Sequence, residues 1–400
     1  MREELGKHLS ALRRENVIGL WHDRMIGAGD EWKGEIDRRL ESAGIILLLV
    51  SPDFIASDYC YDIETKRALE RHAEGKAVVI PIVRLQSLVS DLKDRREGLG
   101  LDSLDYLVIS GDLTNRGGHE EFEKVHYFLS ALVKEMKLTG ERTIIVPGNH
   151  DLSWDVEVYE WMQERRVDIV NLVTGSFVKQ GKGYLIRDDA RYPKRFANFA
   201  RFHHEFKQLE YSLKPELQSL ALLFEETRIQ FLALNSAWLV DEFHPERSAV
   251  NEKALAKGLI EADRQISEAV KARRLDEGAE VLRIAIWHHP VTGNEKIADD
   301  DFLERLRKAD FKLCLHGHIH EDRADLAGYL HSTRRIHIAG AGSFGAVADH
   351  RPPSTPRLYN LIEIPRDHGL IRVHTRCMRK QSGAWEGWAV RSLYEIKLKK

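Results

Sequence analysis

Four short clusters of aspartate, asparagine and histidine follow one another along the chain, and their side chains are of the kinds that bind divalent metal ions. The clusters are Gly111-Asp112, Gly148-Asn149-His150-Asp151, His288-His289-Pro290 and Gly317-His318-Ile319-His320. Carboxylate, amide oxygen and imidazole donors together suit borderline ions such as zinc, manganese and iron. The residue types therefore predict metal-dependent chemistry.

Each cluster directly follows an apolar run, which identifies the elements that must position it. The runs cover residues 106–110, 143–146, 281–287 and 312–315. Short apolar runs bounded by glycine and proline are typical of buried strands. Polar ligands at strand ends lie on loops that a packed sheet holds rigidly. We therefore expect the four clusters to meet at one edge of a sheet.

The order and spacing of the clusters over about residues 100–375 resemble the calcineurin-like metallophosphoesterases. Asn235-Ser236, after the apolar run 229–234, is also similar to that family. The resemblance implies an α/β sandwich of two sheets flanked by helices. It also implies hydrolysis of a phosphomonoester or phosphodiester with a divalent metal such as Mn, Fe, Zn or Ni. Metals supply most of that chemistry, often as a pair about 3.5–4 Å apart.

The resemblance assigns a role to each site residue. Asp112 would bridge two metals, and His320 would belong to the first of them. The second metal would be held by Asn149, His288 and His318. His150 would protonate the leaving oxygen and Asp151 would orient it, which suits an imidazole because histidine titrates near neutral pH.

One motif of the family is missing. The family opens with Asp-x-His at the end of its first strand, and the nearest similar stretch is Ser90-Asp91-Leu92-Lys93. A protonated lysine amine has no lone pair for a metal. The stretch is also too close to Asp112 for a crossover between parallel strands, which takes a dozen or more residues, and residues 88–96 fit a helix better. We therefore expect one well-formed metal site anchored by Asp112 and a second, incomplete site.

The first 84 residues alternate helix and strand patterns, which predicts a parallel sheet. Their motifs resemble a bacterial TIR domain and occur at residues 21–32, 35–36, 45–50 and 51–60. The resemblance implies a flavodoxin-like sheet and self-association between TIR domains. Some TIR domains cleave NAD with a helix glutamate, which matches Glu64 here, where a carboxylate could stabilise a cationic transition state. The interpretation we favour is a surface glutamate on a docking helix.

The TIR resemblance is incomplete at both ends. The first strand should precede Arg2, and the last strand and helix should follow Val83. A truncated parallel sheet exposes unpaired backbone groups at its edge. Either a partner supplies that edge, or the chain is a fragment or a shortened gene product.

Length and composition indicate two domains of ordinary globular character. The chain has 400 residues, a net charge of −3 and 43% hydrophobic residues, which fits two domains. We place a truncated TIR-like domain at 1–85 and the phosphoesterase domain at 86–400, with a helical insertion at about 152–215. The charge makes no general case for binding nucleic acid or membranes. Three scattered cysteines, no signal peptide and no apolar stretch of about 18 residues leave the cytoplasm as the expected location.

Three hypotheses for function follow. The first is a metal-dependent phosphoesterase joined to a TIR signalling module in a bacterial cytoplasm. The second is a weakened relative that binds a phosphate-containing ligand without turning it over. The third is an NAD hydrolase that uses Glu64 and is controlled by ligand binding in the larger domain.

Overall fold

The apolar runs of the sequence form strands in a computed structural model of the protein. The structure describes residues 32–48, 66–74, 76, 78–81, 85–95, 98–168, 172–293, 295–297, 299, 301–319, 323–327, 336–345, 351, 354–379, 384–388 and 393–398. Glu64 and His320 lie outside these residues. Backbone contacts divide the chain into two units, Met1–Leu101 with Met378–Trp385 and Asp102–Cys377 with Glu386–Lys400. The boundary at residue 85 stays a prediction.

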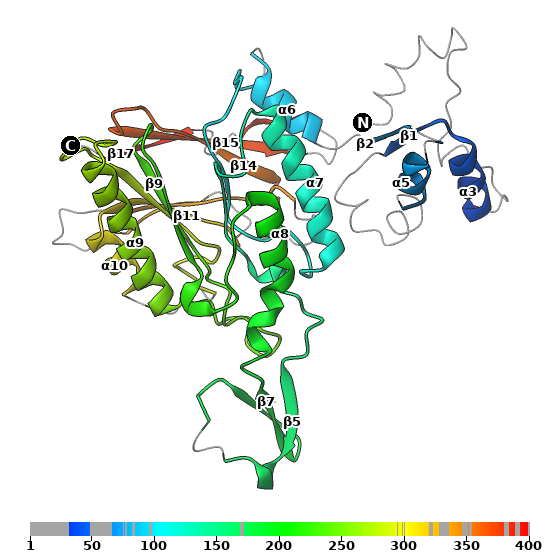
Figure 1. Ribbon diagram of the computed structural model, residues 1–400, viewed down its shortest axis with the longest axis horizontal. Coiled ribbons are helices and arrows are strands. Elements are labelled where there is room, and N and C mark those ends of the chain that lie inside the picture. Colours follow the sequence, from blue (N-terminus) through cyan, green and yellow to red (C-terminus); the bar gives the residue numbers. More distant parts are fainter. Residues whose placement is uncertain are drawn as a thin grey trace. The chain divides into compact units, whose positions relative to one another are not determined.

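The first unit contains the helix and strand alternation expected of a parallel sheet (Figure 1). Its elements are α3 (Trp32–Ser42), β1 (Ile45–Leu48), α5 (Lys66–Ala73), β2 (Val78–Pro81) and α6 (Leu85–Lys93). Strands β1 and β2 pair in parallel, with Ile45 opposite Val78. Ile46 and Ala68 are buried, so the strand and α5 bury apolar side chains. The parallel α/β arrangement is confirmed in this unit.

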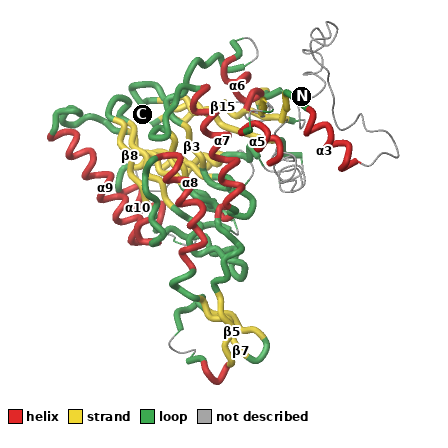
Figure 2. Tube along the Cα trace, turned by 45° about the vertical axis from the view of Figure 1, so that its right-hand side comes forward, coloured by secondary structure: helices red, strands yellow, loops and turns green. Residues whose placement is uncertain are grey.

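A six-stranded sheet forms one layer of the second unit (Figure 2). Its strands, in spatial order, are β12 (Arg323–Ala327), β13 (Ile336–Gly340), β11 (Phe311–His316), β10 (Leu282–Ile286), β9 (Ile229–Leu234) and β8 (Ser219–Phe224). The four central strands are parallel, and both edge strands are antiparallel to their neighbours. Parallel central strands bring their carboxyl ends to one edge, which is where ligands bind in such sheets.

The second layer consists of two groups of strands. One is the parallel pair β3 (Leu107–Ile109) and β4 (Thr143–Ile145). The other contains β14 (Arg357–Glu363), β15 (Leu370–Met378), β16 (Glu386–Gly387) and β17 (Leu393–Lys397). Ile144 and Val373 of this layer pack in one buried cluster with Ile284 and Leu313 of the six-stranded sheet. The expected two-sheet sandwich is therefore confirmed.

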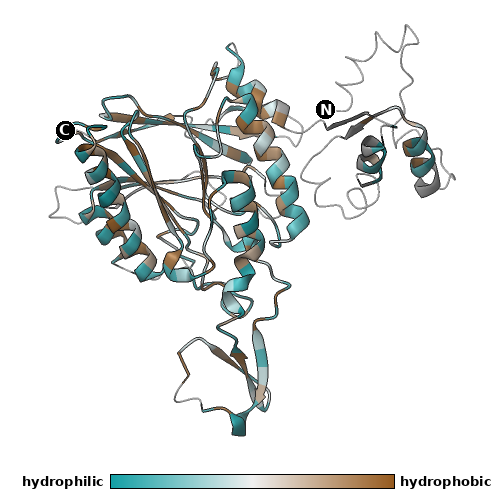
Figure 3. Ribbon diagram, viewed as in Figure 1, coloured by the Kyte–Doolittle hydropathy of each residue, from teal (hydrophilic) through white to brown (hydrophobic). Residues whose placement is uncertain are grey.

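Helices cover the outer faces of the sandwich. They are α7 (His119–Glu135), α8 (Ala197–Lys207), α9 (Glu252–Lys271) and α10 (Phe302–Lys308). Leu232 and Leu234 of β9 point to a cluster shared with α9 and α10, whereas Phe231 and Ala233 point to the inter-sheet core. This alternation is the period of two that a strand imposes. Figure 3 shows apolar strands inside and helices whose polar faces turn outward. No helix among the described residues is long and apolar enough to cross a membrane.

The insertion at 152–215 differs from the expected helical segment. Its first half is a three-stranded antiparallel sheet of β5 (Tyr159–Gln163), β6 (Phe177–Gln180) and β7 (Gly183–Arg187), which projects from the body of the unit (Figures 1 and 2). The prediction of helix was wrong for this half because it relied on aromatic and charged composition. Gly181, with φ of 61°, turns the chain between β6 and β7, as tight hairpins require. The second half is helical, with α8 and the 3-10 turns η6 (Tyr192–Phe196) and η7 (Pro215–Leu217), while η4 (Glu164–Arg166) follows β5.

Candidate active site

Four predicted metal ligands meet at the carboxyl ends of strands from both sheets. Asp112 follows β3, Asn149 opens the 3-10 turn η3 (Asn149–Asp151) after β4, and His288 and His318 follow β10 and β11. His288 Nε2 lies 3.1 Å from Asp112 Oδ2 and 3.1 Å from Asn149 Oδ1. His318 Nδ1 lies 3.1 Å from Asn149 Oδ1 and 3.2 Å from His288 Nε2. Each of these four donor atoms therefore lies within 3.2 Å of at least one other.

The chemistry of this donor set fits a bound cation. The other ring nitrogen of His288, Nδ1, lies 2.6 Å from the Ser110 carbonyl oxygen, and a carbonyl can only accept a hydrogen bond. In the neutral ring, Nε2 therefore presents a lone pair to a carboxylate and an amide oxygen. Ligands of a tetrahedral metal about 2.1 Å away would be about 3.4 Å apart, so the observed spacing suits such an ion.

The electrostatics of the site lead to the same conclusion. Burial raises the pKa of Asp112, but the charge and hydrogen bond of His288 outweigh it, so the pKa lies well below its usual range. Burial lowers the pKa of His288, and the Asp112 carboxylate more than reverses this. Burial and then His288 lower the pKa of His318. Because a positive charge beside Asp112 is what stabilises this buried cluster, a metal ion can take the place of the proton.

The glycines of the motifs are required by close packing around the ligands. Gly111 has φ of 96°, and the ligands Asp112 and His318 have φ of 56° and 69°, a region that costs side-chain-bearing residues free energy and is common at functional sites. A Cβ on Gly111 would lie 2.7 Å from Gly148 N and would overlap the His288 ring. A Cβ on Gly148 would lie 2.8 Å from Asp112 Cγ. Any larger residue would displace a ligand.

Ser236 and His289 form a buried support behind the ligands. Ser236 Oγ accepts hydrogen bonds from the backbone nitrogens of His288 and His289, at 3.2 Å and 3.1 Å. The same hydroxyl lies 2.8 Å from His289 Nδ1. Imidazole atoms of His288, His289 and His318 lie within 4.8 Å of one another, so the ring of His289 lies directly beside the predicted ligands.

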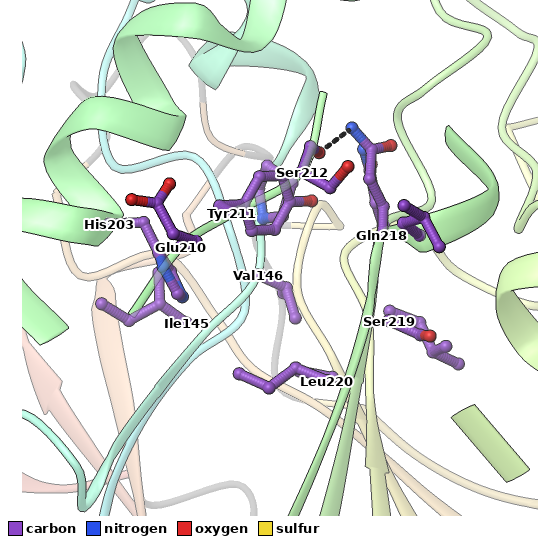
Figure 4. Close-up of a pocket in the computed structure, with 14 residues that line it drawn as sticks. Ile145, Val146, His203, Glu210, Tyr211, Ser212, Gln218, Ser219 and Leu220 are labelled. Atoms are coloured by element: carbon purple, nitrogen blue, oxygen red, sulfur yellow. Dashed lines mark hydrogen bonds between the residues drawn. The ribbon is translucent and has the colours of Figure 1, made fainter. Parts of the chain in front are cut away.

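Asn235 holds the chain that carries Ser236. Its Nδ2 donates to Gln218 Oε1 at 2.8 Å, and its Oδ1 accepts from Ala237 N at 2.7 Å. Both polar atoms of the amide thus make hydrogen bonds within the local structure. Figure 4 shows a neighbouring pocket that Tyr211 and Gln218 both line, and in which Gln218 Nε2 donates to the Ser212 carbonyl oxygen. Ile145, Val146 and Leu220 form its apolar wall.

His150 lies beside the ligands but takes no part in the donor set. Its backbone nitrogen donates to Asp112 Oδ1 at 3.0 Å, and its ring Nδ1 lies 2.9 Å from the Asn115 carbonyl oxygen. Because that carbonyl can only accept, Nδ1 carries a proton and Nε2 is the nitrogen available for proton exchange. The ring is thus oriented by Asn115, rather than by Asp151 as the resemblance implied.

Asp151 organises the backbone instead. Its Oδ1 accepts from Thr114 N at 2.9 Å, and its Oδ2 accepts from Gly148 N at 2.9 Å. Burial, assisted by the nearby Asp112 charge, raises the pKa of Asp151 to about 6, against the effect of these backbone hydrogen bonds. The carboxyl group ties the loops that carry Asp112 and Asn149 to each other. The contacts of Asp151 could not be predicted from the motif.

The stretch that imitates the missing motif does not end a strand. Residues 90–93 lie in α6, in agreement with the helix expected there. The sequence ahead of Asp112 contains no Asp-x-His. His320, the other predicted ligand of the first metal, lies outside the described residues. Of the predicted ligands, the described part of the chain therefore brings together Asp112, Asn149, His288 and His318.

Comparison with known families agrees with this geometry. A family model of calcineurin-like phosphoesterases matches residues 82–322. The chain belongs to the calcineurin-like phosphoesterases. A TIR domain model matches residues 3–124, so a TIR domain precedes the phosphoesterase domain, as expected. The two matches overlap over residues 82–124, which include the helix where the missing motif was sought.

Similar proteins cover only parts of this calcineurin-like phosphoesterase. Uncharacterized protein y4lF of Sinorhizobium fredii is 59% identical over 83 residues, which are 21% of this chain and 26% of that protein. The uncharacterized metallophosphoesterase-like protein YydB of Bacillus subtilis is 24% identical over 226 residues, which are 54% of this chain and 41% of that protein. The chain thus spans well under two thirds of either relative.

Solved structures with some similarity include the purple acid phosphatase PPD1 from yellow lupin seeds. The match has a TM-score of 0.42 and 12% identity, and covers 78% of this chain and 48% of that one. Vacuolar Protein Sorting 29 from Cryptosporidium parvum matches with a TM-score of 0.20 and 17% identity, over 28% of this chain and 51% of that one.

Proposed function

We propose that the protein is a metal-dependent hydrolase of phosphomonoesters or phosphodiesters, with one well-formed metal site. The observation that carries the proposal is the convergence of Asp112, Asn149, His288 and His318, whose donor atoms each lie 3.1–3.2 Å from at least one other of the set. Oxygen and imidazole donors of this mixture suit Mn, Fe, Zn or Ni. When bound, such an ion neutralises phosphoryl oxygens and activates a water molecule.

The remaining residues of the site bind, orient and transfer protons. His150, with Nδ1 fixed on the Asn115 carbonyl, would deliver a proton from Nε2 to the leaving oxygen when the ring is protonated. Asp151 holds the Asp112 and Asn149 loops in register through Thr114 and Gly148. Ser236 fixes the backbone at His288 and His289. Their common effect is to keep the reacting groups in a geometry that needs little rearrangement.

A hydrolysis assay tests this proposal. Purified protein with added Mn²⁺ should hydrolyse bis-p-nitrophenyl phosphate or p-nitrophenyl phosphate. Asp112→Ala and His318→Ala should each lose most of that activity, whereas Glu277→Gln, an exposed carboxylate on the loop after α9, should retain it. Hydrolysis that both site variants keep would overturn the proposal.

Metal content tests the number of sites. We propose about one tightly bound metal per chain, because the second site lacks the Asp-x-His ligands and would retain only Asp112 and His320. Elemental analysis after dialysis should therefore find a value near one. A value near two would contradict this ligand assignment.

The missing motif also favours a second candidate function. A chain that keeps one metal site but cannot complete a pair could bind a phosphate-containing ligand without turning it over. We propose that the TIR domain then drives assembly through TIR–TIR contacts, in a bacterial cytoplasmic signalling setting. Metal binding without hydrolysis of either ester, with concentration-dependent self-association, would favour this alternative over the hydrolase.

The TIR domain itself is the third candidate site. If it cleaves NAD, the loss of NAD should depend on Glu64 and persist in Asp112→Ala. NAD loss that Glu64→Ala leaves unchanged would exclude this role for Glu64.

A further inference from the structure

The ligand His318 has a second contact on the side of its ring away from the cluster. Its Nδ1 faces Asn149 Oδ1 and His288 Nε2, while its Nε2 makes a short hydrogen bond with a carboxylate oxygen of Glu295. A carboxylate can only accept, so this contact keeps the proton of the neutral ring on Nε2. Nδ1 is then left with its lone pair directed at the other three donors.

We propose that Glu295 is a positioning residue that fixes the orientation and tautomer of His318 for metal binding. The inference rests on the proposed function, because it concerns the same metal site. Carboxylates that accept from the free N–H of a metal-bound histidine raise the basicity of the ligand and hold its ring, and their loss weakens metal binding about 10–100-fold. The short motifs of the sequence contain no signal for Glu295, which lies 23 residues before His318.

His318 lies on a tight turn and is held from more than one side. The residue has φ of 69° and follows Gly317, whose close approach to the Ser110 backbone leaves little room for a side chain. The rings of His288 and His289 flank its ring, with centroids 5.1 Å and 4.7 Å away. The Glu295 carboxylate supplies a contact from another loop.

The loop that carries Glu295 is anchored at both of its ends. Ile297 N donates to the Pro290 carbonyl oxygen at 2.9 Å, which closes the loop directly after the His288-His289-Pro290 motif. Ile297 is 4% exposed and packs in the core with Trp287. The Glu295 carbonyl oxygen accepts from Ser248 Oγ at 2.8 Å. One short loop thus begins at the ligand His288 and supports the ligand His318.

The exposure of Glu295 sets the expected size of the effect. Its side chain is 56% exposed, whereas that of His318 is 15% exposed. A half-exposed carboxylate in water interacts weakly as a charge, so its contribution comes from orienting the ring. We therefore expect a loss of metal affinity at the lower end of the range, about 10-fold.

The experiment compares cobalt binding by five forms of the full chain. Co²⁺ is titrated into metal-free wild type, Glu295→Ala, Glu295→Gln, Asp112→Ala and the control Glu277→Gln, and its visible absorption is followed. Glu295→Ala should bind about 10-fold more weakly with an altered absorption band. Glu295→Gln, whose amide oxygen can still accept from Nε2, should recover most of the affinity and the wild-type band. The control should match the wild type.

Two outcomes would overturn the proposal, and a third would overturn the proposed function on which it rests. Cobalt affinity of Glu295→Ala within twofold of the wild type would overturn it while leaving the metal site intact. A lowered melting temperature of Glu295→Ala in EDTA would indicate a structural role instead of a positioning one. Wild type that binds no cobalt, or Asp112→Ala that binds it as wild type does, would overturn the proposed function itself, and is thus a distinct result.

Discussion

Replacing Gly148 by alanine should disable the metal site without changing the ligands themselves. Gly148 has φ of −101° and ψ of −175°, which any residue adopts freely, so the substitution introduces no backbone strain. The added Cβ would lie 2.5 Å from Asp112 N and 2.8 Å from Asp112 Cγ. Both are far inside the 3.4–4 Å of ordinary van der Waals contact. The loop carrying Asp112 must move away.

The distances set the size of the expected loss. To restore contact distance, Asp112 must shift by about 1 Å, and a misplacement of about 1 Å in an active site can cost about 100-fold in rate. That factor corresponds to about 2.7 kcal/mol of transition-state stabilisation. The same shift also disturbs the hydrogen bond from Thr114 N to Asp151 Oδ1, which joins the Asp112 loop to the Asn149 loop.

The assay is the ratio kcat/KM for a nitrophenyl phosphoester with Mn²⁺, together with the dissociation constant for cobalt. The matched control is Gly345→Ala, because a Cβ there would meet nothing within 4 Å. We expect both quantities to worsen about 100-fold in Gly148→Ala and to be unchanged in the control. Wild-type metal affinity in Gly148→Ala, with a normal circular dichroism spectrum, would refute the packing argument.

Three further predictions concern stability. Burial lowers the pKa of His203 to about 4, so the unfolded state binds more protons between pH 6.5 and 4, and the free energy of unfolding should fall by up to about 3 kcal/mol as the pH falls through this range. Denaturation at several pH values should show that the free energy of unfolding depends less steeply on pH in His203→Gln than in the wild type, and an equal dependence would contradict the assignment. The Asn251 side chain accepts from Lys253 N at 3.0 Å at the start of α9, so Asn251→Ala should lower the free energy of unfolding in urea by about 1 kcal/mol and Asn251→Asp by only a few tenths. Equal losses in the two variants would contradict the helix cap. Phe199 is fully buried against Phe122, with ring centroids 6.1 Å apart, so Phe199→Ala should lower the free energy of unfolding by about 3–5 kcal/mol and Phe199→Leu by clearly less. Similar losses in the two variants would argue against tight packing around Phe199.

The sequence was sufficient to predict the sandwich because its strands carry strong local signals. The runs before Asp112, Asn149, His288 and His318 are short, apolar and end in glycine or proline motifs, so both the strand and the ligand after it could be located. The insertion is the counterexample. Its hairpin around Gly181 depends on one two-residue turn, and aromatic and charged composition obscured it.

The sequence by itself pointed to the family, to four candidate ligands that lie together in the structure, and to the absence of the Asp-x-His motif. Each of these depends only on residue type and order, which can be read directly from the sequence. Only the tertiary structure shows that Ser236 contacts His289, that Asn115 contacts the His150 ring, and that Glu295 contacts His318. The physical reason is that a hydrogen bond between distant loops fixes a proton on one ring nitrogen, and such contacts leave no periodic or local signature in the sequence.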